Sequence, residues 1–370
     1  MMTETVVIAD IRSQMFNLPL EEPIQDAMHG LQTYFELVTV QITLTNGLVG
    51  VGYTYTIGRG GHAIKSMIDR DIAPGLIGAQ PNKIDKIYEE ALAVTHYVGR
   101  GGIAAFAISA IDIALWDIRG KRTNTPLWQM AGGGGRTPLT YRGGVDLNFP
   151  MEKLLASIDG HLSEGFEAIK IKIGSKDFRE DVIRVAAVRE RIGSTRKLMV
   201  DANYSYDLER AVVAARAFEE FDLTWLEEPL APDDYAGYGA LAKQTTIPLA
   251  MGENLHTQCE FELAYKYSAI SFIQPDASNC GGVTGFLRAA RAAATHGIPV
   301  CSHGMQELHV SLVAAQPNAG WVEVHSFRID RFTTHRLAMV NGQAIAPNIP
   351  GTGVDFNWDL LAEVSEKVRA

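Results

Sequence analysis

The sequence contains very little cysteine: Cys259, Cys280 and Cys301 are the only three in 370 residues. So small and scattered a set excludes a disulfide framework, and none of the spacings matches a zinc site. We therefore expect a reducing, cytoplasmic setting. The chain also has no apolar run near the roughly eighteen residues that a transmembrane helix needs, and its first residues do not resemble a signal peptide. No membrane partner is expected.

Basic clusters are missing as well. The formal net charge is −10 at pH 7, and no block rich in Lys and Arg interrupts this acidic background. The pattern argues against a nucleic-acid partner. Glycine-rich segments such as "GRGG" (58–61) and "CGGVTG" (280–285) match neither a Walker loop nor the strand-bound GxGxxG pattern, so we interpret them as tight loops.

The first part of the chain has the pattern of an α+β domain. Residues 36–57 predict two strands joined at Asn46-Gly47, a strong hairpin signal. Residues 61–130 follow with apolar side chains at helical spacing. Strands followed by helices indicate an α+β domain over residues 1–130, which ends at the glycine-rich "MAGGGGRTPL" (130–139).

The pattern changes after this boundary. Short apolar runs alternate with amphipathic stretches of helix length, which indicates a parallel sheet. About eight such runs favour a (β/α)8-type barrel over residues 131–325. The tail, residues 326–370, loses the alternation, and we expect it to fold back on the N-terminal domain. The predicted strands are "LTYRGGV", "AIKIKIG", "LMVDAN", "LTWLEEP", "PLAMGEN", "SFIQPDA", "PVCSHG" and "WVEVHS".

Ionisable residues mark the ends of these predicted strands, about one βα unit apart. In a parallel barrel, side chains at the C-terminal strand ends line the active site. Each of them has an ordinary alternative as a helix cap, a turn residue or a loop histidine, but an unbroken series over successive strands favours a site. The series consists of Lys170, Lys172, Asp201, Glu227, Glu253, Asp276, His303 and Glu323.

Three consecutive members of the series, Asp201, Glu227 and Glu253, are carboxylates. Clustered carboxylates repel one another unless a cation lies among them, and hard oxygen ligands suit Mg²⁺. The sequence therefore predicts Mg²⁺ as the cofactor.

Lys170 and Lys172 alternate with isoleucines, so both project from one face of their strand. Taken alone, this pattern is typical of a half-solvated strand. Beside a metal it suggests removal of a proton next to a substrate carboxylate, with Lys170 stabilising the enediolate and Lys172 acting as the base. A second ammonium group nearby would lower the pKa of that base. Asp276 is placed to accept the Nδ1–H of His303 and to fix its tautomer.

Together these residues form motifs that strongly resemble the enolase superfamily, in its mandelate racemase subgroup. The resemblance covers nearly the whole chain, including "IDIALWD" (111–117). It implies an α/β fold, namely a modified TIM barrel, (β/α)7β, with an N-terminal α+β capping domain. The matching motifs are KxK (170–172), "VDAN" (200–203), "EEP" (227–229), "GEN" (252–254), "PD" (275–276), "SH" (302–303) and "WVE" (321–323).

The resemblance also implies roles for individual residues. The three clustered carboxylates would bind Mg²⁺. Lys172 and the His303–Asp276 pair would be acid/base catalysts on opposite faces of the substrate. Glu323 would donate a hydrogen bond to the substrate carboxylate from its protonated form, which requires a raised pKa. Relatives in this family are commonly dimers or octamers, so a homo-oligomer is implied.

The same set of residues serves two reactions. If His303 returns a proton to the α-carbon, the acid is racemised; if it protonates a β-hydroxyl, water leaves and a 2-keto-3-deoxy acid forms. Residues 51–64 and 108–117 resemble acid-sugar dehydratases acting on galactarate and L-talarate, whereas "MGEN" and "SH…QE" are closer to mandelate racemase. We favour a dehydratase of an acid sugar, either a diacid or a monoacid. The alternatives are a racemase or epimerase of a 2-hydroxy acid, and a non-catalytic binding protein, against which the intact residue set argues.

Substrate contacts are expected from both domains. Arg59 lies in the loop after the hairpin and is predicted to pair with a distal carboxylate of the substrate; the alternative is a solvated surface arginine. The other candidate contacts are Tyr55 and His29 in the N-terminal domain and Asn203 in the barrel.

Overall fold

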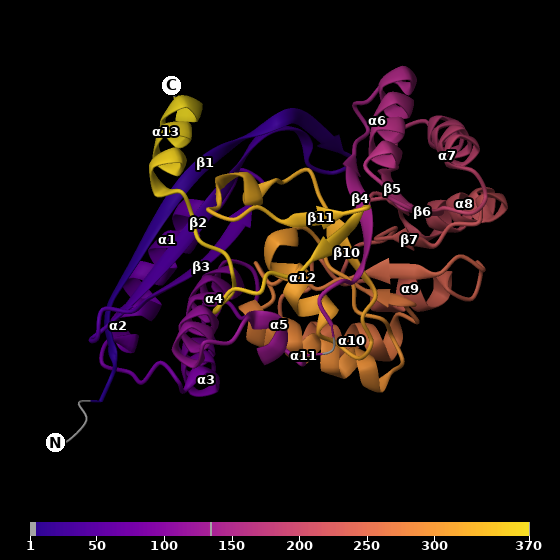
Figure 1. The fold of residues 1–370 in the computed structure, drawn as a ribbon. Helices are drawn as coiled ribbons and strands as arrows, with labels where there is room; N and C mark the ends of the chain where they lie inside the picture. The colour runs from indigo at the N-terminus through magenta and orange to yellow at the C-terminus, as the bar shows by residue number, and fades with distance from the viewer. Residues whose placement is uncertain (1–4, 134, 370) are drawn as a thin grey trace.

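The computed structural model describes residues 5–133 and 135–369. Figure 1 shows two parts side by side, an N-terminal domain in indigo and purple and a barrel in magenta and orange. Within these described residues, no helix is both long and apolar enough to cross a membrane.

The N-terminal domain begins with an antiparallel sheet in the order β1-β2-β3. The predicted hairpin at Asn46-Gly47 is confirmed, because the strands on either side of it pair in register. The sequence pattern does not predict β1, since Pro19 and Pro23 interrupt it. As an edge strand β1 tolerates these prolines, and its register shifts between Pro19 and Ile24. The strands are β1 (Ile8–Asp26), β2 (Gly30–Leu44) and β3 (Val49–Thr56).

Helices then cover this sheet, as the helical spacing predicts. The longest, α4, is buried along most of its length because it lies between β3 and a barrel helix, α11 (Gly282–Thr295). Gly52 permits the close approach: a Cβ there would lie 2.0 Å from the carbonyl oxygen of Ala110. The helices are α1 (Gly61–Met67), η1 (Ile68–Ile72), α2 (Ala73–Leu76), α3 (Ile84–Thr95), α4 (Ile103–Thr123) and α5 (Leu127–Met130).

The barrel contains a seven-stranded sheet of parallel strands in the order β10-β4-β5-β6-β7-β8-β9. Its strands are β4 (Leu139–Val145), β5 (Ala168–Lys172), β6 (Lys197–Asp201), β7 (Trp225–Glu227), β8 (Leu249–Met251), β9 (Phe272–Ile273) and β10 (Trp321–Val324). The remaining barrel helices are α6 (Met151–Ser163), α7 (Phe178–Ile192), α8 (Leu208–Phe218), η2 (Glu219–Phe221), α9 (Tyr235–Leu241), α10 (Gln258–Tyr267) and α12 (Gln306–Ala314).

One predicted strand, "PVCSHG" (299–304), is wrong as a regular element. Only Val300 pairs there, through isolated parallel bridges to Ile273 and Ala319. Pro299 has no N–H to donate, and the chain turns at Gly304, so the pairing stays short. The two bridges nevertheless connect β9 with the segment before β10 and complete the ring.

The strand register aligns the predicted site residues. Lys172 at the end of β5 pairs with Asp201 on β6, and Asp201 pairs with Glu227 on β7. All five residues of β5 are buried, so its lysines point into the barrel and not into solvent.

The N-terminal domain covers the C-terminal ends of the barrel strands. Thr54 on β3 donates to the carbonyl oxygen of Ser278 at 2.7 Å. On α4, the hydroxyl of Ser109 accepts hydrogen bonds from the backbone N–H groups of Gly281 and Gly282, both at 2.9 Å. These contacts fix the domain over the open end of the barrel.

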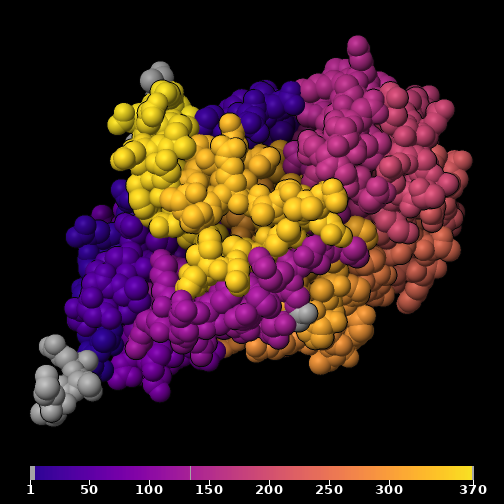
Figure 2. All heavy atoms as spheres, viewed as in Figure 1, coloured from indigo at the N-terminus to yellow at the C-terminus, as the bar shows by residue number. Residues whose placement is uncertain are grey.

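The C-terminal segment leaves the barrel after β10 and reaches the N-terminal domain. Its last helix packs beside β1, where the backbone N–H of Asn17 donates to Ser365 at 2.8 Å. Figure 2 shows these yellow residues lying against both indigo and purple atoms of the first domain and orange atoms of the barrel. The elements are η3 (Ile329–Phe332), β11 (Ala338–Val340), β12 (Gln343–Ile345) and α13 (Trp358–Arg369).

Candidate active site

The three predicted carboxylates meet at the C-terminal ends of β6, β7 and β8. One oxygen from each of Asp201, Glu227 and Glu253 lies within 4.8 Å of the other two. Protein donors hold the second oxygen of two of them: the backbone N–H of Asn203 donates to Asp201 at 2.9 Å, and the indole of Trp225 donates to Glu227 at 2.8 Å. The remaining oxygen of each of these two carboxylates accepts a hydrogen bond from a buried lysine, so the cluster lies between fixed N–H donors and two ammonium groups.

This cluster fits a divalent cation with oxygen ligands. Burial, together with the neighbouring carboxylates, raises the pKa of Glu227 to about 8, so the carboxylate cluster is short of positive charge. Oε2 of Glu253 is buried and has no hydrogen-bond partner among the described residues. An unsatisfied buried carboxylate oxygen is costly, and Mg²⁺ would satisfy it.

Two buried lysines border the carboxylates. Lys170 Nζ lies 2.5 Å from Glu227 and 2.9 Å from Glu323, and Lys172 Nζ lies 2.5 Å from Asp201. The expected lowering of the Lys172 pKa is wrong for this arrangement. Burial and the Lys170 ammonium do lower it, but the Asp201 carboxylate raises it more, and the net pKa lies above its usual range. Lys172 can therefore act as a base only when the charge of Asp201 is compensated.

The expected raised pKa of Glu323 is wrong as well. Burial raises the pKa of Glu323, but the ammonium of Lys170 lowers it more, and the net direction is downward. The backbone N–H of Gly304 donates to its other oxygen at 3.0 Å. Glu323 is therefore an ionised acceptor in this structure and not a protonated donor.

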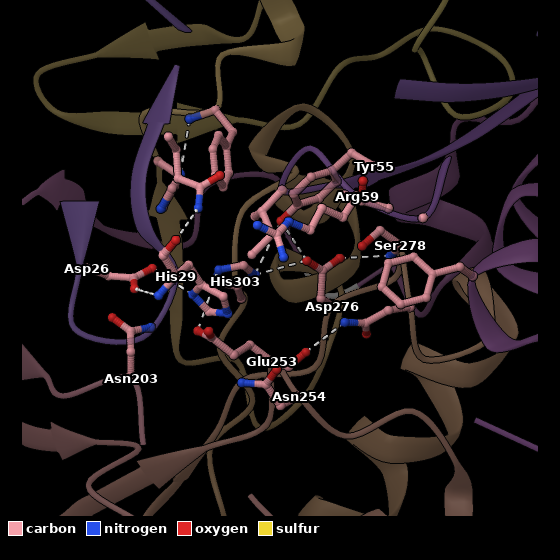
Figure 3. Close-up of a pocket in the computed structure, with 18 of the residues that line it drawn as sticks. Asp26, His29, Tyr55, Arg59, Asn203, Glu253, Asn254, Asp276, Ser278 and His303 are labelled. Atoms are coloured by element: carbon pink, nitrogen blue, oxygen red, sulfur yellow. Dashed lines mark hydrogen bonds and ion pairs between the residues drawn. The ribbon is translucent and has the colours of Figure 1, made fainter. Parts of the chain in front are cut away.

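Histidine and aspartate form a pair on the other side of the cluster. Nδ1 of His303 lies 3.0 Å from Oδ2 of Asp276, and Nε2 lies 3.5 Å from Oε2 of Glu253. Burial lowers the pKa of His303, but Glu253 and Asp276 together raise it to about 10. Asp276 thus orients the ring so that Nε2 faces the carboxylate cluster. Figure 3 shows His303 between Asp276 and Glu253.

A cavity of about 340 Å³ lies between the barrel and the N-terminal domain and reaches both Lys172 and His303. Ile24, Ile103 and Phe106 give it an apolar side, whereas Asn203 brings a buried amide oxygen without a hydrogen-bond partner in the described chain. The cavity is therefore mostly apolar, with polar groups gathered near the carboxylates, as in many small-molecule sites.

The predicted contacts of the N-terminal domain all line this cavity, in different ways. Arg59 is exposed and points into it (Figure 3). Both ring nitrogens of His29 are already bonded, to Asp26 at 2.8 Å and to the hydroxyl of Tyr204 at 2.7 Å. The hydroxyl of Tyr55 is likewise engaged by the histidine–aspartate pair. Of these three side chains, only Arg59 has a polar group that makes no hydrogen bond to another described residue.

Among the polar cavity residues that sequence reasoning missed, Asp146 and His325 lie at the ends of barrel strands. Asp146 follows β4 directly, and burial raises its pKa to about 7. His325 follows β10, two residues after Glu323. The signal that finds the other strand-end residues applies directly to Asp146, since no other residue is predicted at the end of β4, and it applies to His325 once more than one polar residue per strand is admitted.

Comparisons with known proteins agree with this geometry. The family model of the mandelate racemase / muconate lactonizing enzyme N-terminal domain matches residues 8–132, and the enolase C-terminal domain-like model matches residues 153–360. Among curated proteins, the 3,6-anhydro-alpha-L-galactonate cycloisomerase of Streptomyces coelicolor is 40% identical over 97% of this chain and 99% of its own. The L-talarate/galactarate dehydratase of Salmonella typhimurium is 38% identical over 83% of this chain and 78% of its own.

Solved structures give the same result. A racemase from Streptomyces coelicolor with bound magnesium superposes with a TM-score of 0.94 at 40% identity, covering 97% of this chain and 100% of that one. The Salmonella dehydratase, solved with Mg and L-lyxarohydroxamate, gives a TM-score of 0.92 at 34% identity, covering 96% of this chain and 92% of that one. The chain belongs to the mandelate racemase subgroup of the enolase superfamily.

Proposed function

We propose that this protein is a Mg²⁺-dependent enzyme that removes the α-proton of a sugar acid and expels the oxygen on the β-carbon, giving a 2-keto-3-deoxy acid. One observation carries the proposal: Lys172 and His303 stand at different edges of the carboxylate cluster and line the same cavity. Lys172 adjoins Asp201, whereas His303 adjoins Glu253. A substrate between them meets one proton carrier on each side.

The metal would be held by Asp201, Glu227 and Glu253, whose inward oxygens form a hard donor set. When bound, Mg²⁺ supplies positive charge that offsets the negative charge developing on the substrate carboxylate as the α-proton leaves. Lys170, buried between Glu227 and Glu323, adds a fixed ammonium charge at the same end of the site. The magnesium in related structures supports this assignment.

The side chains would then share the proton transfers. Lys172 takes the proton from the α-carbon, and the electrons of that C–H bond form a carbon–carbon double bond. The bond from the β-carbon to its oxygen breaks, and His303, oriented by Asp276, gives the departing oxygen a proton. The resulting enol tautomerises to the 2-keto acid. General acid/base transfers of this kind contribute roughly 10²–10⁴-fold each.

The leading candidate is a dehydratase, in which the departing oxygen is a hydroxyl and water is released. The similarity to a talarate/galactarate dehydratase supports it. Arg59, exposed at the cavity and free of protein partners within the described part of the chain, suits the distal carboxylate of a diacid.

A second candidate is a cycloisomerase of an anhydro sugar acid, the activity named for the relative that matches nearly the whole chain. In a 3,6-anhydrogalactonate the oxygen on the β-carbon is a ring ether, so the same elimination opens the ring and releases no water. The apolar side of the cavity, with Ile103 and Phe106, favours a substrate with fewer hydroxyl groups.

One assay separates these outcomes. The protein is incubated with Mg²⁺ and a library of aldarates, aldonates and anhydroaldonates in D₂O, and products are followed by NMR and mass spectrometry. A 2-keto acid lighter by one water identifies a dehydratase, and a 2-keto acid isomeric with its substrate identifies a cycloisomerase. Deuterium at C2 without a keto acid would instead establish a racemase or epimerase. If no substrate in the library shows deuterium exchange or forms a keto acid, the result would favour a binding protein.

A further inference from the structure

His325 occupies a position in the site that the steps above do not use. It follows β10, so that Glu323, His325 and Phe327 alternate along one face of the chain. Glu323 lies at the depth of Lys170, and Phe327 reaches the N-terminal domain, where its ring centroid is 5.6 Å from that of Tyr55. His325 stands between these levels, 3% exposed, and lines the cavity. It therefore lies at the depth where the reacting carbons must be held.

A backbone contact fixes the tautomer of this histidine. The N–H of Phe327 donates to Nδ1 of His325 at 3.0 Å, so Nδ1 is an acceptor and carries no proton. Burial lowers the pKa of His325 to about 3, which keeps the ring neutral. A neutral imidazole with an acceptor Nδ1 carries its proton on Nε2. The side chain thus offers one N–H donor.

No described residue accepts a hydrogen bond from this Nε2–H. A ring nitrogen of His325 lies within 4.8 Å of ligand atoms of His303 and Glu323, but no ion pair or hydrogen bond joins His325 to either of them. A metal among these three is disfavoured because the Lys170 ammonium lies 2.9 Å from Glu323. Because His325 lines the cavity, the acceptor for this donor is expected to be a group held in the cavity.

We propose that Nε2–H of His325 donates a hydrogen bond to the oxygen on the β-carbon of the substrate, and that it selects acids carrying oxygen at that carbon. The placement follows from its neighbour: the His303 and His325 rings are 5.6 Å apart, and His303 is the group assigned to protonate the departing oxygen. His325 does not transfer a proton. It orients the C–O bond toward His303. This inference rests on the proposed function for its substrate class.

Two matched acids test it. Threonate and 2,4-dihydroxybutanoate differ only in the oxygen on C3. We expect the Mg²⁺-loaded protein to bind threonate about 10-fold more tightly, the size of one good hydrogen bond. Dissociation constants are measured by calorimetry, with any turnover followed by NMR.

Two substitutions separate substrate contact from packing. In His325→Asn, the amide oxygen replaces Nδ1 and can still accept from Phe327, but no donor reaches the position of Nε2. In His325→Gln, the amide nitrogen falls near the position of Nε2. We expect the preference for threonate to disappear in His325→Asn and to survive in part in His325→Gln. If His325 only holds Phe327, the preference for threonate should survive in His325→Asn and weaken in His325→Gln. That result would overturn the proposal.

Further outcomes also decide the matter. Equal affinity of the wild-type protein for both acids, or an equal loss of affinity for both in His325→Asn, contradicts the proposal. Spectra of protein labelled with ¹⁵N-histidine, with the signal assigned by its loss in His325→Asn, should show Nε2 protonated and Nδ1 not; the opposite tautomer contradicts it too. If no sugar acid yields a 2-keto acid, the proposed function fails, while the affinity ratio still reports on His325.

Discussion

Tyr55 in the N-terminal domain donates a hydrogen bond to Oδ2 of Asp276 in the barrel at 2.9 Å, and its hydroxyl lies 3.3 Å from Nδ1 of His303. The same carboxylate oxygen lies 3.0 Å from the histidine nitrogen. Tyr55 therefore holds the carboxylate that orients His303 and is not a free hydroxyl for the substrate. The orientation of a barrel histidine depends on a residue from the other domain.

We expect Tyr55→Phe to lower kcat about 10- to 100-fold with little change in KM, because it removes a hydrogen bond to a charged group that acts through His303. Steady-state kinetics on the substrate found in the D₂O assay measure both constants. Exchange of the α-proton by Lys172 should be less affected than elimination.

Tyr53→Phe provides the matched control. Tyr53 lies two residues earlier on β3 and donates to Glu307 at 2.5 Å, so it makes the same kind of contact between the domains without touching the histidine–aspartate pair. We expect its kcat to stay within a few-fold of the wild-type value. Similar losses in both variants would show that Tyr55 acts only through domain packing.

The parts of the fold that repeat could be predicted from the sequence, and the parts set by single tertiary contacts could not. Alternating runs predict the barrel, since each βα unit has the same length and pattern. The edge strand β1 could not be predicted, because Pro19 and Pro23 interrupt its pattern. Only its pairing with β2 shows that it is an edge strand, where prolines are tolerated. The strand predicted at 299–304 shrinks to two isolated bridges at Val300 for a similarly local reason.

The site shows the same division. Barrel geometry places equivalent strand ends side by side, so Asp201, Glu227 and Glu253 could be grouped without a structure. The direction of a pKa shift depends on which partner lies within a few ångströms, and here Asp201 outweighs Lys170 beside Lys172. No spacing in the sequence reports that balance. The tautomer of His325 is equally hidden, because a backbone N–H sets it.

Glu253→Gln should abolish Mg²⁺-dependent turnover, because the amide brings no charge to a cluster in which Glu253 has a buried oxygen without a hydrogen-bond partner in the described chain. We expect Mg²⁺ affinity, measured by calorimetry on the metal-free protein, to fall at least about 100-fold, because the site loses one charged ligand. Near-normal rates in this variant would show that the ligand assignment is wrong.

Glu307→Gln is the control for the metal experiment. Glu307 is also a buried carboxylate, 4% exposed, but it bonds to Tyr53 and lies outside the cluster of Asp201, Glu227 and Glu253. We expect it to keep the Mg²⁺ affinity of the wild-type protein. A loss as large as that of Glu253→Gln would mean that removal of any buried carboxylate disturbs the barrel.

His303→Asn should stop elimination and leave α-proton exchange by Lys172 on one enantiomer of the substrate. The asparagine can still hydrogen-bond Asp276, but it cannot give a proton to the departing oxygen. NMR in D₂O measures exchange and product formation in the same sample. Survival of elimination at more than about one hundredth of the wild-type rate would remove His303 from the mechanism.

Asp112 predicts a pH dependence of stability. This carboxyl group of α4 is buried, and burial raises its pKa from 3.8 to about 7. A raised pKa means that the folded state holds the proton more tightly than the unfolded chain, so the contribution is favourable at low pH and is lost as the pH rises toward 7. The slope is at most about 1.4 kcal/mol per pH unit, so we expect a loss of about 2 kcal/mol between pH 5 and pH 7.

Asp112→Asn should remove this part of the slope. Both oxygens of Asp112 accept hydrogen bonds from Thr284, one from its backbone N–H at 2.8 Å and one from its hydroxyl at 2.6 Å. An asparagine can accept from the backbone N–H with its carbonyl oxygen and donate to the hydroxyl with its amide. Urea unfolding at pH 5 to 8 measures the slope, with Glu190→Gln, an exposed carboxylate on α7, as the control. Asp146 and Glu307 also have raised pKa values, of about 7 and 8, so the wild-type slope is shared, and the difference between variants isolates Asp112. If Asp112→Asn follows the wild-type curve while remaining folded, Asp112 is ionised at pH 7 and its charge is balanced where it contacts the barrel.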